Sequence, residues 1–403
     1  MNILLVNHYA GSPELGMEFR PYYMAKEWVK AGHNVLIVGA SFSHLRKKQP
    51  EGEESVIDGV RYRWIKVNPY QGNGLGRIRS MFTFVTKLYN GYCKLLGDFK
   101  PDAVIASSTY PLDIYPCRRI AKHYGAKLVY EVHDLWPLSP MELGGYSKHH
   151  PFIMVMQAAE DYCYRHADKV VSLLPAALPH MVERGMSPDK FAYVPNGFDP
   201  AEWNITKALP DEHQTVIKRL HDEGKFILLY VGGHAISNSL NTLLDAAKKV
   251  ENSKVAIVLV GKGNEKDRLV KRVEDEKIEN IVFLSPVDKQ CVPALLSEAD
   301  ALYIGWEANP LYRFGICPNK LVDYMVSGKP IIHSVTAAND AVKEANCGIS
   351  VPAGDAEGVA KAIVDLADSS KEHLHMIGIN GHEYAMKIYP YATLASNFIK
   401  SIS

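Results

Sequence analysis

Cysteine is scarce in this sequence and scattered along it. The 403 residues include six cysteines, and no two of them form a Cys-x-x-Cys pair. Disulfide frameworks and structural zinc sites need clustered ligands, so neither is expected to organise this chain. Reduced thiols in a cytosol are the ordinary interpretation.

An excess of charge and a long apolar run are also missing. Lys+Arg and Asp+Glu both number 45, so no global field favours nucleic acid, and we expect no such partner. No run of about 18 apolar residues could span a bilayer. Met1 leads directly into Asn2-Ile3-Leu4-Leu5-Val6 without a basic segment or cleavage site, which predicts a first buried strand instead of a signal peptide. A cytoplasmic protein is expected.

What the sequence does contain is alternation of short apolar runs with helix-length amphipathic segments. With 47% hydrophobic residues, there is material for two cores. A polar pause at 195–224 separates the two series, so the pattern predicts an α/β protein of two doubly wound domains with parallel sheets. Strands are expected at 3–6, 35–38, 103–106, 128–131, 170–173, 192–194, 226–231, 255–260, 281–284, 301–304, 330–333 and 349–351. Helices are expected near 19–31, 112–124, 152–167, 371–387 and 391–400, with a proline at 390 between the last two.

Ligands of open α/β sheets bind beyond the carboxyl ends of the strands, so the loops there are the places to examine. The loop after Val6 contains Gly11 and Gly16, which allow close backbone approach before a helix N-terminus. It lacks Gly-x-Gly-x-x-Gly and an acidic residue about twenty positions further on, which argues against a nucleotide-dependent oxidoreductase. A long surface loop is the alternative for this segment.

Two further loops carry candidate side chains. His133 and Asp134 follow the strand at 128–131; the imidazole could hold a substrate hydroxyl, and Asp134 could orient it or cap the next helix, although a structural histidine is equally compatible. In the segment 312–332, Pro318-Asn319 precedes a short helix on which Lys320 and Asp323 share a face. Helix N–H groups and a lysine suit a diphosphate, and a carboxylate suits ribose hydroxyls; a surface ion pair is the alternative.

Several of these segments, in this order, resemble motifs of family 4 retaining glycosyltransferases of the GT-B fold. Pro-Asn-Lys-Leu at 318–321 and Gly-Lys-Pro at 328–330 are similar to the nucleotide-binding segment of the bacterial O-antigen, capsule and exopolysaccharide branch. His-Asp-Leu-Trp-Pro at 133–137, Pro-Asn-Gly-Phe-Asp at 195–199 and Val-Gly-Lys-Gly at 260–263 also match family segments. The resemblance covers nearly the whole chain.

The resemblance implies two Rossmann-like domains facing across a cleft. Residues 1–200 would bind the acceptor, 201–387 would bind the donor, and a helix at about 388–403 would cross back onto the first domain. The implied reaction transfers a sugar, with retention and without a metal ion, from a nucleotide-diphosphate donor to a saccharide acceptor. The resemblance to this branch indicates UDP as the nucleotide and an acceptor that is usually lipid-linked. Front-face attack needs no side-chain nucleophile and no cofactor. The charge on the departing diphosphate would be stabilised by N–H groups and the lysine.

The roles carried over residue by residue fall into three groups. His133, beside the donor sugar, and Lys320, on the diphosphate, would be catalytic. His8, Tyr9 and Asp134 would lie on the acceptor side. The donor would be bound by Gly16, Gly232, Gly233, His234, Gly261, Ser285, Val287, Gly315, Pro318, Asn319, Lys320 and Asp323, and no metal ligand is expected.

Three departures from the family pattern stand out. Gly315 occupies the position of the first of two family carboxylates, the second being Asp323. The loop Gly232-Gly233-His234 lacks the Arg and Lys that many members direct at the diphosphate, and no Asp-x-Asp follows a strand. Lys320, His234 and N–H groups would then do more of the binding. A GT-B epimerase or hydrolase and a non-catalytic nucleotide-sugar binder stay open as alternatives.

The segment 76–96 combines cations with large apolar and aromatic residues. A basic amphipathic helix can lie in a membrane interface, which would place the protein peripherally on the inner face of the plasma membrane. The alternative is a helix that packs on its own sheet while its lysines extend to solvent.

Overall fold

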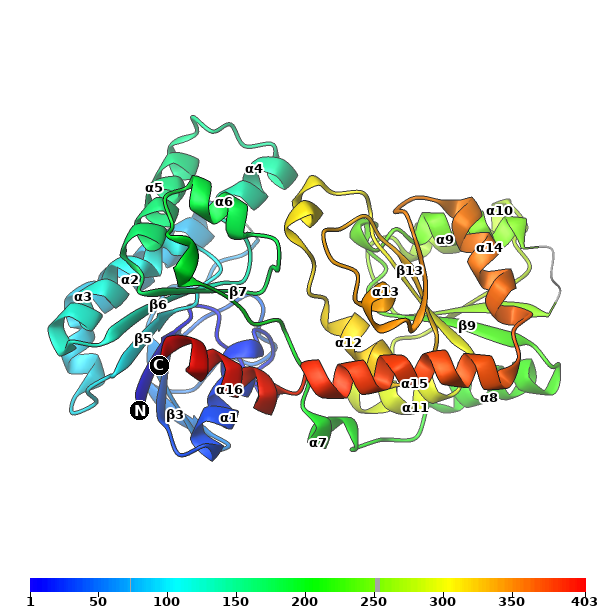
Figure 1. Cartoon of the computed structure of the whole chain (residues 1–403), viewed down its shortest axis with the longest axis horizontal. Coiled ribbons are helices and arrows are strands. Elements are labelled where there is room, and N and C mark those ends of the chain that lie inside the picture. The colour runs from blue at the N-terminus through cyan, green and yellow to red at the C-terminus, as the bar shows by residue number, and fades with distance from the viewer. Residues whose placement is uncertain (73, 251–253) are drawn as a thin grey trace. The chain divides into compact units, whose positions relative to one another are not determined.

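The computed structural model describes residues 1–72, 74–250 and 254–403. They form two compact units, each built around its own sheet (Figure 1). Unit 1 comprises Met1–Asn196 and Tyr391–Ser403, and unit 2 comprises Gly197–Pro390. The expectation of an α/β chain with two doubly wound parallel sheets is confirmed.

The sheet of unit 1 has eight strands in the order β3-β4-β2-β1-β5-β6-β7-β8. Neighbouring strands are parallel except for β3 and β4, an antiparallel hairpin at the edge that the sequence pattern did not reveal. Its strands are half-exposed and alternate in polarity, so they lack the continuous apolar run of a central parallel strand. The strands are β1 (Asn2–Val6), β2 (Asn34–Ala40), β3 (Glu54–Ile57), β4 (Val60–Ile65), β5 (Ala103–Ala106), β6 (Lys127–Val132), β7 (Lys169–Ser172) and β8 (Phe191–Tyr193).

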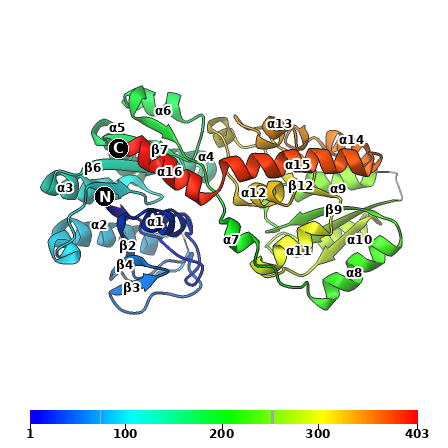
Figure 2. The same ribbon diagram turned by 60° about the horizontal axis from the view of Figure 1, so that its bottom comes forward.

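Helices cover both faces of this sheet. The helices α1 and α16 lie side by side and share one core with β1 and β2, whereas α2, α3 and α5 pack together and against β4, β5 and β6 (Figure 2). The helices of unit 1 are α1 (Arg20–Lys30), α2 (Leu75–Leu96), α3 (Ile114–Tyr124), α4 (Leu138–Gly144), α5 (Pro151–His166), α6 (Leu178–Glu183) and α16 (Tyr391–Ile402), with 3₁₀ turns η1 (Pro111–Asp113) and η2 (Pro188–Lys190).

The C-terminal helix α16 is fixed to α1 by aromatic contacts. Tyr391 stacks on Tyr23 with ring centroids 4.7 Å apart, and Phe398 meets the edge of Trp28 at 5.2 Å. The indole N–H of Trp28 donates to the Ala395 carbonyl at 3.1 Å. All these side chains are buried, so the last helix completes the core of unit 1.

The sheet of unit 2 has six parallel strands in the order β11-β10-β9-β12-β13-β14. The helices α9, α10 and α14 cover one face, and α8, α11, α12, α13 and α15 cover the other. The strands are β9 (Phe226–Val231), β10 (Val255–Val260), β11 (Ile281–Leu284), β12 (Ala301–Gly305), β13 (Ile331–Ser334) and β14 (Gly348–Val351). The helices are α7 (Pro200–Trp203), α8 (Asp211–Asp222), α9 (Leu240–Lys249), α10 (Lys266–Asp275), α11 (Val292–Ser297), α12 (Asn319–Val326), α13 (Ala341–Ala345), α14 (Ala356–Ala367) and α15 (Lys371–Ile388), with 3₁₀ turns η3 (Ile236–Asn238), η4 (Lys289–Cys291) and η5 (Pro310–Phe314).

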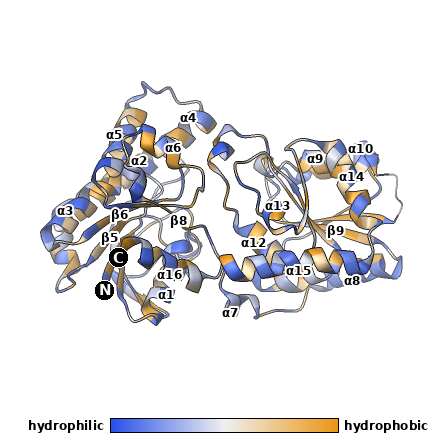
Figure 3. Cartoon of the chain, in the orientation of Figure 1, coloured by the Kyte–Doolittle hydropathy of each residue, from blue (hydrophilic) through white to orange (hydrophobic). Residues whose placement is uncertain are grey.

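The segment 195–224, where the sequence pattern pauses, contains helical structure. It contains α8, a polar helix that buries only His213, Ile217 and Leu220 against unit 2. Three buried residues in a twelve-residue helix are too few to dominate its composition, which explains why the sequence pattern did not reveal α8. The central strands of both sheets are mostly apolar and buried, and Figure 3 colours much of them orange. Within the described ranges, no helix is long and apolar enough to cross a membrane.

Candidate active site

The loops that follow β1, β5 and β6 are joined by hydrogen bonds at the carboxyl edge of the first sheet. These three strands are neighbours, so the residues after them meet. Asn7 donates from Nδ2 to the Ser107 carbonyl at 2.6 Å, and Ser107 Oγ lies 3.0 Å from Nε2 of His133. The sequence placed His133 at a strand end, and the structure shows what it is bonded to there.

A buried ion pair lies beneath His133. Glu131 accepts from Nε of Arg20 at 2.9 Å with one carboxylate oxygen, while its other oxygen accepts from Ser107 Oγ at 2.6 Å and lies 3.3 Å from His133 Nε2. Arg20 also donates to the carbonyls of Val194 and Pro195. Burial by itself raises the pKa of Glu131, but the charge of Arg20 and the bonds from His133 and Ser107 lower it to about 2. An ionised carboxylate therefore fixes one nitrogen of the imidazole.

The other imidazole nitrogen, Nδ1 of His133, has no hydrogen-bond partner in the described part of the chain. The side chain is 11% exposed, so it reaches the surface of unit 1. A histidine held at one nitrogen by a carboxylate and presenting the other is the arrangement that orients a ring toward a ligand. A contact between His133 and the donor sugar stays a prediction.

Asp134 does not orient this imidazole. Its Oδ1 accepts from the N–H of Leu135 at 2.9 Å and from Ser139 Oγ at 2.6 Å. The side chain of Asp134 therefore bonds to residues at the start of α4, and Glu131, not Asp134, orients the imidazole of His133. This corrects one of the two roles considered for Asp134; a contact with an acceptor stays a prediction.

His8 and Tyr9 were expected on the acceptor side, but the structure buries both side chains. His8 is 0% and Tyr9 is 1% exposed. His8 Nδ1 lies 2.6 Å from the Tyr110 hydroxyl, and the Tyr9 hydroxyl accepts from Nε of Arg77 at 3.0 Å. Their side chains lie one layer below the surface in this conformation, where they support the loop. Strand-end position alone does not separate a surface loop residue from a buried one.

Gly16 closes a tight turn in the first loop. Its N–H donates to the Ser12 carbonyl at 2.7 Å, and the N–H of Ser12 donates back at 3.0 Å. A Cβ at Gly16 would lie 2.8 Å from the backbone nitrogen of Lys47, and φ is +107°. Glycine is required for this turn, but its N–H is already used and is not available to a phosphate here. Close backbone approach is what Gly16 contributes.

In unit 2, the loops after β9 and β10 pack backbone to backbone. A Cβ at Gly261 would lie 1.9 Å from the Gly232 carbonyl oxygen, and one at Gly263 would lie 2.2 Å from the carbonyl oxygen of His234. The N–H of His234 donates to Lys262 at 2.9 Å. Only glycine permits this approach. The neighbouring Gly233 is exposed, and its N–H donates to no described group.

Lys320 lies directly over this glycine loop. Its ammonium donates to the Tyr230 hydroxyl at 3.0 Å and to Asn238 Oδ1 at 3.2 Å, and it sits 4.4 Å from the centre of the Tyr230 ring. A Cβ at Gly232 would come within 2.7 Å of it. Burial lowers the pKa of Lys320 to about 8. Among the described residues its hydrogen-bond partners are neutral, so its charge remains available to an anion.

The surface ion pair that Lys320 and Asp323 could have formed is absent from the described part of the chain. Burial raises the pKa of Asp323 to about 6, and the nearby charge of Lys289 opposes this shift. No described donor bonds to the Asp323 side chain. Lys320 and Asp323 therefore lie on one short helix without pairing with each other. Such an arrangement suits a ligand that carries both an anionic group and hydroxyl donors.

His234 is fully buried beneath the glycine loop. Both ring nitrogens lack a partner among the described residues, and burial together with the charges of Lys266 and Lys320 lowers the pKa of His234 to about 4. The neutral imidazole lies between Tyr230 and Phe283. Its side chain fills space under the loop, and a direct contact with the donor stays a prediction.

The other donor-side candidates lie in loops and at a helix start. Pro318 is the N-cap of α12, and the exposed Asn319 is its first residue; the N–H groups of Asn319 and Lys320 have no described acceptor. Gly315 is buried with φ +101°, a conformation that a carboxylate residue would adopt only with strain. Ser285 is exposed, and its carbonyl accepts from His213 at 2.8 Å, while Val287 packs on the core.

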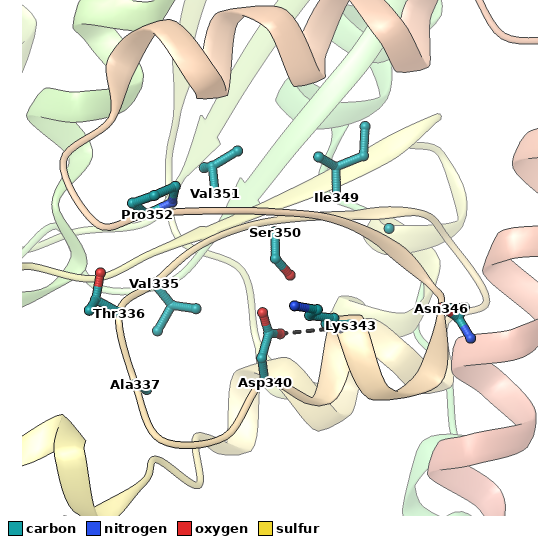
Figure 4. A pocket seen from close by; sticks show the side chains of 11 residues that line it. Val335, Thr336, Ala337, Asp340, Lys343, Asn346, Ile349, Ser350, Val351 and Pro352 are labelled. Atoms are coloured by element: carbon teal, nitrogen blue, oxygen red, sulfur yellow. Dashed lines mark hydrogen bonds between the residues drawn. The ribbon is translucent and has the colours of Figure 1, made fainter.

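A separate cavity of about 680 Å³ lies at the carboxyl ends of β13 and β14. Asp340, Lys343 and Ser350 turn toward one another in it (Figure 4). Asp340 accepts from Nδ1 of the buried His333 at 2.9 Å and from the N–H of Val342 at 3.1 Å, so it chiefly caps α13. None of the predicted site residues lines this cavity.

Sequence reasoning missed Arg20, Ser107 and Glu131 in unit 1 and Tyr230 and Asn238 in unit 2. Glu131 had a usable signal, because a carboxylate inside the apolar run of β6 must have a partner. Nothing local identifies Arg20, which lies 111 positions away. In the described ranges, no group of three or more His, Cys, Asp or Glu side chains is arranged to hold a metal ion.

Comparison with known proteins identifies the family. Residues 16–197 match the model of the glycosyl transferase 4-like domain, and residues 225–369 match that of glycosyl transferases group 1. A chain with two Rossmann-like units and these two matches is a glycosyltransferase. It belongs to family 4, the retaining GT-B enzymes, as its motifs indicated.

Two distant relatives are named as glycosyltransferases. WcaI of Escherichia coli, named as a colanic acid biosynthesis glycosyl transferase, is 23% identical over 75% of each chain. WbjE of Pseudomonas aeruginosa, named as a glycosyltransferase, is 22% identical over 75% of this chain and 73% of its own. The crystal structure of HepE from Anabaena in complex with UDP superposes with a TM-score of 0.70 over 100% of this chain and 99% of its own, at 18% identity, and HepE has also been solved with UDP-glucose.

Proposed function

We propose that the protein transfers a sugar, with retention, from a UDP-sugar bound by unit 2 to a lipid-linked saccharide bound by unit 1. The polymer would be a bacterial surface polysaccharide. The complexes of HepE with UDP and UDP-glucose support the donor, and the name of WcaI supports the kind of product.

Lys320 carries this proposal. A half-buried ammonium held by neutral partners above a glycine loop offers a cation to a diphosphate without first breaking an ion pair. The N–H groups of Gly233, Asn319 and Lys320 would add donors, the last two at the positive end of α12. Negative charge grows on the diphosphate as the glycosidic bond breaks, so these groups would stabilise the transition state more than the ground state.

Asp323 would accept the ribose hydroxyls one turn along α12. Its pKa of about 6 leaves it mostly ionised at pH 7, as an acceptor from two hydroxyls must be. These bonds exist before and during the reaction, so Asp323 would serve donor binding more than turnover. Ser285 and Val287 would border the base, and Gly261 would allow the donor close to the backbone.

His133 would contact the reacting sugar through Nδ1, because Glu131 and Ser107 hold its other nitrogen. Front-face attack by the acceptor hydroxyl, assisted by the departing phosphate oxygen, requires no side-chain nucleophile, and we nominate none. The transfer would need no metal ion. A sugar-nucleotide hydrolase or epimerase is the second candidate, favoured by Gly315 in place of the first family carboxylate.

Two measurements test the proposal. A thermal-shift screen of nucleotides should give the largest increase with UDP or a UDP-sugar, since a ligand at a hundred times its Kd stabilises by about 2.7 kcal/mol. Radiolabelled UDP-sugars with a lipid-linked oligosaccharide extract should then yield a longer saccharide. Free sugar alone would identify a hydrolase, and binding without any product would leave only a nucleotide-sugar binder.

The helix α2 would provide contact with the membrane. Its inner face, including Phe84 and Leu88, is buried, but Leu75, Phe82 and Tyr89 recur every seventh residue on the outer side and are 84%, 42% and 39% exposed. Cosedimentation with vesicles rich in phosphatidylglycerol should decrease when Phe82 and Leu75 are changed to serine. Unchanged cosedimentation would leave α2 as a helix that only packs on its own sheet.

A further inference from the structure

A group of two arginines and a histidine lies beside the loop after β1, apart from the His133 network. His44 comes from the loop after β2, Arg46 lies two residues further on, and Arg77 is the third residue of α2. Arg77 and His44 both contact the ring of Tyr9. The guanidinium of Arg77 lies 5.3 Å from the centre of that ring, and the ring of His44 lies 5.8 Å from it. The group therefore combines the loop after β2 with the start of α2.

The charged groups that act on the nearby histidines His8 and His44 are positive. Burial, followed by the charges of Arg46, Arg77 and His44, lowers the pKa of His8 to about 3. The same holds for His44, where burial and Arg77 lower the pKa. Neither Arg46 nor His44 takes part in an ion pair in the described ranges. The local potential is positive, although the whole chain has no net charge.

Arg46 adds a charge that folding leaves incompletely paired. It is 6% exposed and donates to the carbonyls of Ala10 at 2.7 Å and Ala40 at 2.9 Å, while its Nη2 has no partner. Burial lowers the pKa of Arg46 to about 10, so it remains charged. A buried guanidinium without a carboxylate costs stability, and a bound anion would offset that cost.

The side chain of Arg77 is fixed in place by aromatic neighbours. Its Nε donates to the Tyr9 hydroxyl at 3.0 Å, and its guanidinium lies over the rings of Tyr9 and Trp136 at 5.3 and 5.7 Å. It also stands in the first turn of the 22-residue helix α2, where the helix dipole is positive. Two guanidinium charges, a histidine and a helix start suit a dianion better than a single carboxylate.

We propose that this cluster, formed by His44, Arg46 and Arg77, binds a phosphate or diphosphate ester carried by the acceptor. Arg77 and His44 contact the anion, and the buried Arg46 supplies charge from below. The inference rests on the proposed function, in which unit 1 holds the acceptor. It adds that the acceptor is recognised by its phosphate group as well as by its sugar.

The test is a calorimetric titration of the full chain with saturating UDP, which fills the donor site of unit 2. The probes are farnesyl diphosphate, inorganic pyrophosphate and farnesol. Wild-type protein should bind at least one diphosphate and not farnesol. Arg77→Ala should weaken that binding about ten-fold or more, the scale of a charge-assisted contact. His44→Glu, which places a negative charge at this exposed position, should do the same.

Arg61 provides matched controls, because it is an exposed arginine on β4 outside the cluster. Arg61→Ala and Arg61→Glu should bind the diphosphates as wild type does. Binding of pyrophosphate and farnesyl diphosphate alike would show that phosphate suffices, and binding of farnesyl diphosphate alone would show that the lipid is also read. No diphosphate binding, equal binding of farnesol, or wild-type affinity in Arg77→Ala and His44→Glu would overturn the proposal. Failure of UDP itself to bind would instead count against the proposed donor site.

Discussion

Replacing Glu131 by glutamine keeps the shape of the side chain but removes the charge between Arg20 and His133. Both members of the ion pair are almost fully buried, with side chains 1% and 2% exposed. Breaking a buried pair by removing one partner typically costs about 3–5 kcal/mol, because the remaining charge is left without compensation. Unit 1 of Glu131→Gln should therefore be less stable at pH 7 by about that amount.

The pH dependence gives the same prediction a second test. The folded-state pKa of Glu131 is about 2, below the ordinary value of 4.5. A depressed carboxyl pKa stabilises the fold above the unfolded-state value, and this stabilisation is lost as the pH falls from about 4.5 through about 2. The difference corresponds to roughly 3 kcal/mol. Wild type should lose this stability over that window, and Glu131→Gln should lose correspondingly less.

Hydrogen exchange read by mass spectrometry on peptides of β6 and α1 measures unit 1 separately from unit 2. Glu54→Gln is the matched control, since Glu54 pairs with Arg63 at 2.9 Å but is 65% exposed and should cost less than about 1 kcal/mol. If Glu131→Gln protected these peptides as well as wild type at pH 7, the ion pair would not support His133 as described.

Three further results are expected. Gly261→Ala should destabilise unit 2 by about 1–3 kcal/mol in urea unfolding, because its Cβ would lie 1.9 Å from the Gly232 carbonyl oxygen. Gly233→Ala is the control and should not destabilise it, because the added Cβ meets only Asn238 at 4.0 Å. Equal stabilities of the two variants would refute the close loop packing. The affinity for UDP measured by calorimetry should fall as the pH rises through about 8, because free Lys320 then loses its proton, and an affinity constant up to pH 9.5 would remove Lys320 from the diphosphate. Turnover should survive EDTA, and a loss restored by magnesium or manganese would contradict the metal-independent transfer.

Much of the architecture follows from the chain pattern. Continuous apolar runs such as Phe226–Val231 predict buried parallel strands, and the structure has β9 at those residues. The edge hairpin of β3 and β4 and the polar helix α8 did not follow, since elements that bury little leave a weak periodic signal. The sequence is informative where burial is extensive.

The site was predictable only in part, because local position does not report burial or long-range partners. Lys320 was recognisable from its motif, but its contact with Tyr230 joins residues 90 positions apart. His8 and His234 stand at strand ends as His133 does, yet the fold buries both. Glu131 supports His133 from two residues away, a role that the adjacent Asp134 was a candidate to fill.

The most direct test of the donor site is steady-state kinetics of Lys320→Ala and Asp323→Ala with a UDP-sugar, with folding checked by circular dichroism. Lys320→Ala should reduce kcat by roughly two to three orders of magnitude, the scale for loss of one transition-state donor. Asp323→Ala should chiefly raise the donor KM, by about ten- to a hundred-fold, because ribose bonds of about 1.5–3 kcal/mol are equal in ground and transition states. Wild-type kinetics in both variants would show that the donor is not bound at α12.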